Sequence, residues 1–233
     1  MSIPLFSVIW LVMLIPSITF HEFMHGWAAY KLGDPTAKNA GRLTLNPIKS
    51  IDPFGSILLP LVGFFLGGVI FGYAKPVPYN PRYFKNLRQG EIIVGFAGPA
   101  ANLLLAIFGA AMAWAGMGAL VLSATFGSAL VLVGSTLAAA NLVLMFFNLI
   151  PIPPLDGSSI VPLFLPNAWL PGWYGIQRYA FAIFLVLVFG IPYLSSLVGL
   201  GSFSPFGWYL EHTALALLQF ALPPGVASAL GLM

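Results

Sequence analysis

Residues 92–155, IIVGFAGPAANLLLAIFGAAMAWAGMGALVLSATFGSALVLVGSTLAAANLVLMFFNLIPIPPL, contain no charged side chain. A membrane-spanning helix needs about 20 apolar residues, so this run holds two spans, which we place at about 92–118 and 126–150. The small and polar residues at 123–128 predict the turn between them. The run therefore predicts an all-α, polytopic membrane protein.

The composition of the whole chain supports this class. Of its 233 residues, 59% are hydrophobic and 6% are charged, whereas a soluble domain carries about 25% charged residues. Disorder needs low hydrophobicity and high charge, and the absence of Cys excludes a disulfide scaffold and thiolate metal ligands. The net charge of +3 rests on few residues, so nucleic acid is not an expected partner. We expect the lipid bilayer to be a partner of this chain.

Eight of the nine Lys and Arg residues lie between positions 31 and 88. An apolar first span at about 3–29 precedes them and has no Lys or Arg before it. The positive-inside rule then places the N-terminus outside and the segment after Tyr30 in the cytoplasm. Two more helices are expected at about 179–198 and 205–222, of which the second either crosses the membrane or lies in the interface.

Residues 54–72, FGSILLPLVGFFLGGVIFG, are apolar enough to span the membrane. A crossing here would put the basic segments on its two sides in different compartments, against the charge rule. Pro60 and several glycines also make a poor continuous helix. We therefore expect a re-entrant element, with a plain transmembrane helix as the alternative.

The first span contains His21-Glu22-Phe23-Met24-His25, an H-E-x-x-H motif. Residues four apart share one face of a helix, so both imidazoles can bind one zinc ion while Glu22 acts as general base. Ionisable residues at membrane depth indicate function. The alternative is a His and Glu set that caps the helix end at the interface.

A catalytic zinc site needs a third protein ligand. Asp34 and Asp52 lie next to prolines in the basic loop and are expected to be solvated turn residues. Asp156 stands alone within NLIPIPPLDG at 148–157, where the prolines prevent a helix. Gly157 permits a close approach of the chain to another group. Asp156 is therefore the candidate ligand.

Three motifs together resemble the site-2 protease family of intramembrane zinc metalloproteases. They are HEFMH at 21–25, AGPAAN at 97–102 and NLIPIPPLDG at 148–157, and they follow one another in the family's order. The resemblance covers about residues 5–160. The first and last motifs together are specific to the family, whereas H-E-x-x-H alone is not.

The resemblance implies an enzyme that cleaves transmembrane protein substrates within or near their membrane-spanning segments. It implies one zinc ion per chain, bound by His21, His25 and Asp156, with Glu22 as the catalytic base. The expected location is a bacterial or archaeal cell membrane, with the active site towards the cytoplasm. No oligomeric state is assigned.

The resemblance also implies how the chain is divided. Residues 1–160 would form a three-span protease core, with a membrane-inserted β-hairpin in the re-entrant segment 54–72. Residues 161–233 would add one or two membrane helices. The chain has no polar stretch long enough for the PDZ or CBS modules of larger family members, so we expect a compact form.

A protease must hold its substrate in an extended conformation, and a strand edge does so by β-augmentation. The candidate edge is Ser56, Ile57, Leu58 and Leu59. Asn148 and Asn102 are candidates for binding the substrate backbone or the oxyanion. For Asn102 we favour an interhelical hydrogen bond, and for Asn148 both roles stay open.

A membrane zinc transporter or metal-binding channel is the alternative function, with the same side chains binding zinc in transit. Transporters usually contain internal repeats, and neither motif occurs twice in this sequence. A transporter also has no use for Glu22 beside the metal. A scaffold with an inactive site is disfavoured by the complete set of ligands and base.

Overall fold

The computed structural model describes residues 5–58, 73–199 and 203–231. Within these ranges every regular element is an α-, 3-10 or π-helix. The all-α fold class predicted from the sequence is therefore confirmed.

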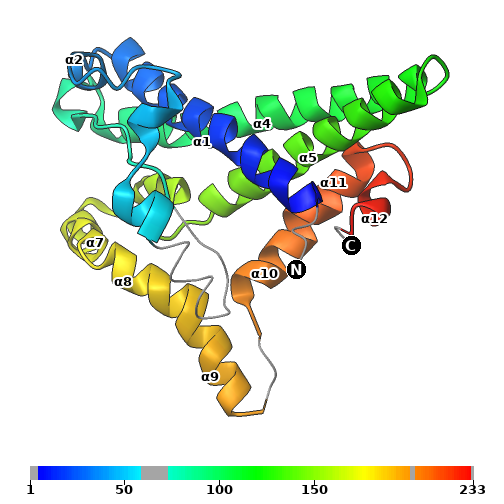
Figure 1. The fold of residues 1–233 in the computed structure, drawn as a ribbon. Helices are drawn as coiled ribbons and strands as arrows, with labels where there is room; N and C mark the ends of the chain where they lie inside the picture. Colours follow the sequence, from blue (N-terminus) through cyan, green and yellow to red (C-terminus); the bar gives the residue numbers. More distant parts are fainter. Residues whose placement is uncertain (1–4, 59–72, 200–202, 232–233) are drawn as a thin grey trace. The chain divides into compact units, whose positions relative to one another are not determined.

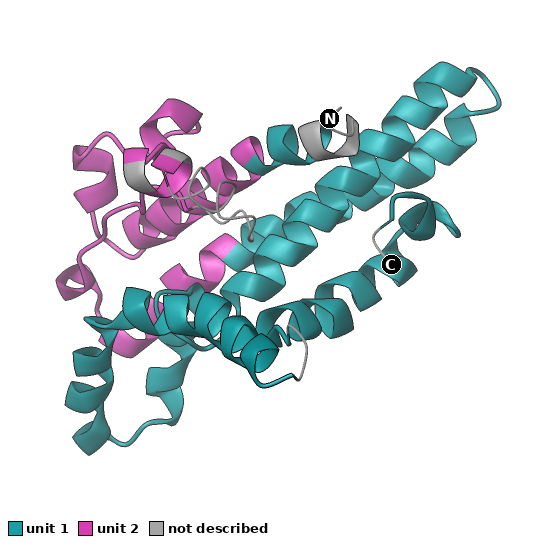
Figure 2. Cartoon of the chain, turned by 60° about the horizontal axis from the view of Figure 1, so that its bottom comes forward, with its two compact units in different colours: residues 1–14, 99–233 teal, residues 15–98 magenta. Residues whose placement is uncertain are grey.

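The chain forms two compact units, which are coloured separately in Figure 2. Unit 1 combines residues 1–14 with 99–233, and unit 2 comprises residues 15–98. Helices α1 (Leu5–Lys31) and α4 (Leu87–Ala119) each contribute residues to both units. The division at residue 160 expected from the sequence stays a prediction.

In unit 1, α4 lies antiparallel beside α5 (Ala124–Asn148), as Figure 1 shows. Glycines let the two backbones approach closely. A Cβ at Gly109 would lie 2.6 Å from the Gly134 carbonyl oxygen, and one at Gly116 would lie 2.9 Å from the Gly127 carbonyl oxygen. These contacts fix the register of the helix pair.

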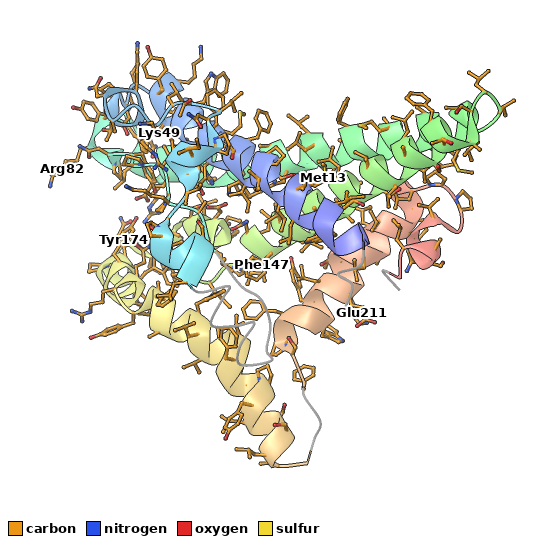
Figure 3. The ribbon with its side chains drawn as sticks, in the orientation of Figure 1. Met13, Lys49, Arg82, Phe147, Tyr174 and Glu211 are labelled. Atoms are coloured by element: carbon orange, nitrogen blue, oxygen red, sulfur yellow. The ribbon has the colours of Figure 1, made fainter. Side chains whose placement is uncertain are left out.

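The remaining elements of unit 1 are short helices. They are η4 (Asp156–Ile160), α6 (Val161–Phe164), η5 (Asn167–Trp169), α7 (Leu170–Gln177), α8 (Ala180–Leu185), η6 (Val186–Gly190), α9 (Ile191–Leu197), α10 (Pro205–Leu210), η7 (Glu211–Leu215), α11 (Ala216–Ala221) and α12 (Val226–Ala229). Ala214 and Leu218 share a hydrophobic core with Leu142 of α5. Phe147, labelled in Figure 3, contacts Phe184 and Phe206 through ring centroid distances of 6.0 and 5.7 Å.

Three helices among the described residues are long and apolar enough to cross a membrane. They are Leu87–Ala119, Ala124–Asn148 and the continuous helical stretch Ala180–Leu197. Each coincides with an expected span. Helix also covers 5–29 of the expected segment 3–29 and 205–221 of the expected segment 205–222, and their crossing of the membrane stays a prediction.

Unit 2 packs the second half of α1 against the beginning of α4. Its core contains Ala28, Ala29, Phe84 and Val94. The segment between the two helices holds short elements: α2 (Thr36–Asn39), η1 (Pro47–Ser50), η2 (Pro53–Leu58) and η3 (Pro81–Tyr83). The small side chains of Ala28 and Ala29 let this segment and α4 lie close to α1, which carries the H-E-x-x-H motif.

The strand expected at 56–59 is wrong for the residues that the structure describes. Residues 53–58 form the π-helix η2. The Ser56 amide donates to the Asp52 carbonyl oxygen (2.8 Å), a local bond that takes up the amide that a neighbouring strand would use. Leu59 and the rest of the expected re-entrant segment, 59–72, lie outside the described residues, so its path and hairpin stay predictions.

Candidate active site

His21 and His25 lie on one face of α1, as their spacing predicts. Their Nε2 atoms are 3.0 Å apart, and the two rings stand almost perpendicular, with an interplanar angle of 84°. His21 is only 6% exposed. The motif ends six residues before α1 ends at Lys31, so these side chains do not cap the helix end, and that alternative is wrong.

The tautomer of His25 follows from its other ring nitrogen. Nδ1 lies 2.6 Å from the carbonyl oxygen of Val94 in α4. A carbonyl oxygen only accepts, so Nδ1 carries a proton. In the neutral form of the ring this tautomer leaves the lone pair of Nε2 for a metal ion. Metal-binding histidines usually have such a partner, which fixes the ring and its tautomer.

Gly98 of the AGPAAN motif leaves room beside the two imidazoles. A Cβ at this position would lie 2.4 Å from Nε2 of His25 and 2.6 Å from Nε2 of His21, closer than any real side chain approaches. Glycine is therefore required here by the space in front of the two nitrogen atoms.

The two imidazoles fit zinc. Zinc–nitrogen bonds of about 2.0–2.1 Å in a tetrahedral site place two ligand nitrogens about 3.3 Å apart, close to the observed separation of 3.0 Å. Neutral imidazole is a zinc ligand, and His25 has the required tautomer. The distance between the two Nε2 atoms concerns His21 and His25 and does not involve a third ligand.

Glu22, next to the first histidine, is held by a backbone amide from a distant segment. Its Oε2 accepts a hydrogen bond from the Val77 amide at 2.9 Å. Val77 is buried and lies between two prolines in an irregular segment. The Val77 amide therefore fixes the direction of the Glu22 carboxylate. This contact cannot be inferred from the position of Glu22 on α1.

The expectation that Asp34 is solvated is wrong. Asp34 is fully buried, with 0% exposure. Its Oδ1 accepts from the amide of Thr36 (2.9 Å), and its Oδ2 accepts from the amide of Asn80 (2.6 Å). Asp52 directly precedes η2 and is partly buried. Its carboxylate accepts from the Gly55 amide at 2.7 Å, so Asp52 binds the first turn of that helix rather than standing free in solvent.

Asp156 belongs to unit 1 and begins the 3-10 helix η4, after the turns that follow α5. The close approach predicted at Gly157 is confirmed, because a Cβ there would lie 2.2 Å from the Leu149 carbonyl oxygen. The backbone at Asp156 is therefore tightly packed. It is helical from Asp156 onwards, in η4, and irregular only over the residues before it. The histidine pair belongs to unit 2, and Asp156 as third zinc ligand stays a prediction.

Asn102 makes the interhelical contact that the sequence favours for it. Its amide donates to Oδ1 of Asn141 (2.8 Å), whose own amide donates to the Leu137 carbonyl oxygen (2.9 Å). Both asparagines are 0% exposed. Asn148, the last residue of α5, donates to the Leu144 carbonyl oxygen at 3.0 Å.

Sequence reasoning missed four contributors: the Val94 carbonyl group, the Val77 amide, Gly98 and Asn141. The Val94 carbonyl group could not be found from the sequence, because every residue has a backbone carbonyl group. Val77 is the one residue of 76–78 with an amide hydrogen, because its neighbours are prolines. Gly98 lies within the quoted AGPAAN motif.

A helical protein with apolar spans and a histidine pair next to a glutamate held by a backbone amide has the features of a membrane zinc metallopeptidase. The chain belongs to peptidase family M50, the site-2 protease family, whose model matches residues 9–133. No solved structure matches it.

Two bacterial relatives illustrate the similarity. The "Putative zinc metalloprotease YwhC" of Bacillus subtilis is 44% identical over 184 residues, which cover 76% of this chain and 78% of the relative. The "Putative zinc metalloprotease Rip2" of Mycolicibacterium smegmatis is 34% identical over 183 residues, covering 74% of this chain and 63% of the relative. The family and these names identify the chain as a zinc metalloprotease.

Proposed function

We propose that the protein is an intramembrane metalloprotease that hydrolyses peptide bonds within or near the transmembrane segments of membrane protein substrates, as in regulated intramembrane proteolysis. The observation that carries this proposal is the histidine pair on α1, whose Nε2 atoms lie 3.0 Å apart. The part of α1 that precedes the pair, from Leu5 to Phe20, is mostly apolar and contains no charged side chain. Membership of the site-2 protease family supports it.

The proposed ligands of a single zinc ion are His21, His25 and Asp156. Two neutral imidazoles and one carboxylate are a usual donor set for catalytic zinc, which keeps one position open. When bound, zinc polarises the scissile carbonyl group and lowers the pKa of a water molecule. The tight backbone around Gly157 supports Asp156, because a ligand on rigid backbone keeps its direction.

Glu22 is the proposed general base and acid. It takes a proton from the attacking water and returns it to the nitrogen atom of the leaving amine. The Val77 amide holds Oε2, so Oε1 is the proposed proton acceptor. Uptake and return by the same carboxyl group balance the proton over the hydrolysis.

Substrate binding is proposed at two places. Asn148 at the end of α5 is a candidate for contacting the substrate backbone, while the buried bond between Asn102 and Asn141 favours a packing role for Asn102. Residues 56–59 remain candidates for substrate contact, although 56–58 are helical and would not provide a strand edge.

We place the protein in a bacterial cell membrane, with the N-terminus outside and the active site towards the cytoplasm. The excess of basic residues in unit 2 supports this orientation. The partners are the bilayer and a transmembrane substrate.

The test uses purified protein in lipid vesicles with a single-span substrate labelled at both ends. We expect cleavage within or beside the span, its loss on chelation and its recovery when zinc is returned. Vesicles containing a zinc-sensitive dye test the alternative in parallel. Zinc uptake without cleavage would contradict the protease and favour a transporter.

A further inference from the structure

The segment 75–80, KPVPYN, is bonded to α1 and to the chain that follows α1 as far as Arg42. Three hydrogen bonds do this: Arg42 Nη2 to the Lys75 carbonyl oxygen (2.6 Å), the Val77 amide to Glu22 Oε2 (2.9 Å) and the Asn80 amide to Asp34 Oδ2 (2.6 Å). All six residues belong to unit 2. The middle bond reaches the glutamate of the zinc motif.

The Val77 amide is the backbone donor at the centre of this segment, and its two proline neighbours restrict its direction. Pro76 and Pro78 have no amide hydrogen, and each restricts the residue before it to an extended conformation. Val77 therefore presents its N–H from a backbone with few alternative conformations. Little conformational entropy is lost when that N–H is held against the Glu22 carboxylate.

Packing holds Val77 at the same place. Its side chain is only 7% exposed, and its Cγ1 lies 2.8 Å from where a Cβ of Gly26 would be. Gly26 is four residues after Glu22 and so lies on the same face of α1. The missing side chain at Gly26 lets the segment lie against the helix.

Asp34 anchors the far end of the segment. Its carboxylate is fully buried and accepts from Thr36 on one oxygen and from Asn80 on the other. A buried carboxylate with two sets of donors is costly to misplace, because each lost partner leaves a charge unsatisfied. The turn bearing Asp34 is itself bonded to α1 through the Asp34 amide and the Ala29 carbonyl oxygen (3.0 Å).

We propose that Val77 and Asp34 are positioning residues for Glu22: the Val77 amide aims the carboxylate, and Asp34 fixes the segment that carries this amide. The inference rests on the proposed function, because it assigns a role in the reaction of Glu22. Neither residue contacts the reacting atoms. Both residues act through the orientation of the Glu22 carboxylate, so their effect is on kcat.

The test removes the donor and keeps the side-chain volume. Val77→Pro abolishes the N–H in a segment that is already extended, while Val77→Ala keeps the N–H and removes packing. We expect Val77→Pro to retain zinc and KM and to lose about 10-fold to 100-fold in kcat, because misplacing a catalytic group by about 1 Å costs on that order. Val77→Ala should keep most of kcat. Equal kcat values for the two variants would overturn the proposal.

A double-mutant cycle tests the link through Asp34. If Asp34 acts through the Val77 amide, Asp34→Asn lowers kcat in the wild-type chain but has little further effect in Val77→Pro. If the fold-losses in kcat of the two single variants multiply in the double variant, the two residues act independently and the link is overturned. If Val77→Pro fails to fold, judged by helicity and zinc content, Asp34→Asn alone decides: unchanged kcat with bound zinc overturns the proposal.

The same measurements separate this inference from the proposed function. Failure of the wild-type protein to cleave would overturn the proposed function and this inference with it. Normal wild-type cleavage with an unaffected Val77→Pro variant would overturn only the positioning role.

Discussion

His25 and Val94 are 69 residues apart in the chain, yet Nδ1 of His25 donates to the Val94 carbonyl oxygen at 2.6 Å. This bond couples the zinc motif on α1 to the beginning of α4. It leaves the Nε2 lone pair for the metal and places Gly98, one turn further along α4, directly in front of both imidazoles. The AGPAAN motif thereby acquires a physical role beside the zinc motif.

Gly98→Ala should displace the imidazoles and weaken zinc binding at least about 10-fold, a usual cost of disturbing the surroundings of metal ligands. The new Cβ would lie 2.4 Å from Nε2 of His25. The control is Gly118→Ala in the same helix, where a Cβ meets nothing within 4 Å. Competition with a zinc chelator measures both variants, and equal affinities would contradict the assigned role of Gly98.

Asp156→Ala should remove the third zinc ligand. Two imidazoles alone do not complete a catalytic site, so we expect purified Asp156→Ala to contain little zinc, together with wild-type helicity. Elemental analysis against protein concentration gives the ratio, which should be near one zinc per chain in the wild type. Full occupancy in the variant would point to another acidic ligand.

The histidine pair illustrates how much of the site could be predicted from the sequence. The i, i+4 spacing of H-E-x-x-H fixes two side chains on one helix face, because the helix period is constant. The contacts to Glu22 and His25 come from the backbone of Val77 and Val94, and a backbone group looks the same at every residue. The burial of Asp34 could not be predicted, because its Gly-Asp-Pro neighbours are typical of a solvated turn and its partner Asn80 lies 46 residues away.

The fold shows the same pattern. Long apolar runs identified α4, α5 and the stretch Ala180–Leu197, because uniform hydrophobicity over 18 or more residues in a span leaves few alternatives to a helix. The close contact between Gly109 and Gly134 could not be predicted, since many glycines occur in these spans. The strand expected at 56–58 failed because apolar short runs do not distinguish strand from helix.

Gly134→Ala should destabilise the helix pair in unit 1. Its Cβ would lie 2.6 Å from the Gly109 carbonyl oxygen and from the Ala113 amide nitrogen, and backbone atoms cannot rotate away as side chains do. Overpacking of this kind costs about 1–3 kcal/mol of unfolding free energy. Gly118→Ala, with open space around it, should be neutral or stabilising. Unfolding titrations in detergent compare the two variants.

Residues 31–50 and 75–90 should both face the cytoplasm, because positive charges near the spans set the orientation. The chain contains no Cys, so Lys38→Cys and Lys85→Cys each introduce a unique thiol at an exposed position. An impermeant maleimide should label both from the cytoplasmic side only. Labelling from opposite sides would make 54–72 a true span.

Glu22→Gln separates proton transfer by Glu22 from zinc binding, because it keeps the size of the side chain and an oxygen that accepts from the Val77 amide but cannot take up a proton. The measurement is the cleavage rate of a membrane-spanning substrate by the variant and by the wild type at equal zinc content. We predict full zinc binding, substrate that co-purifies uncut, and a rate lower by about 100-fold to 10,000-fold or more, as expected for general acid–base catalysis. Cleavage by zinc-loaded Glu22→Gln at close to the wild-type rate would contradict the proposed role of Glu22 as general base.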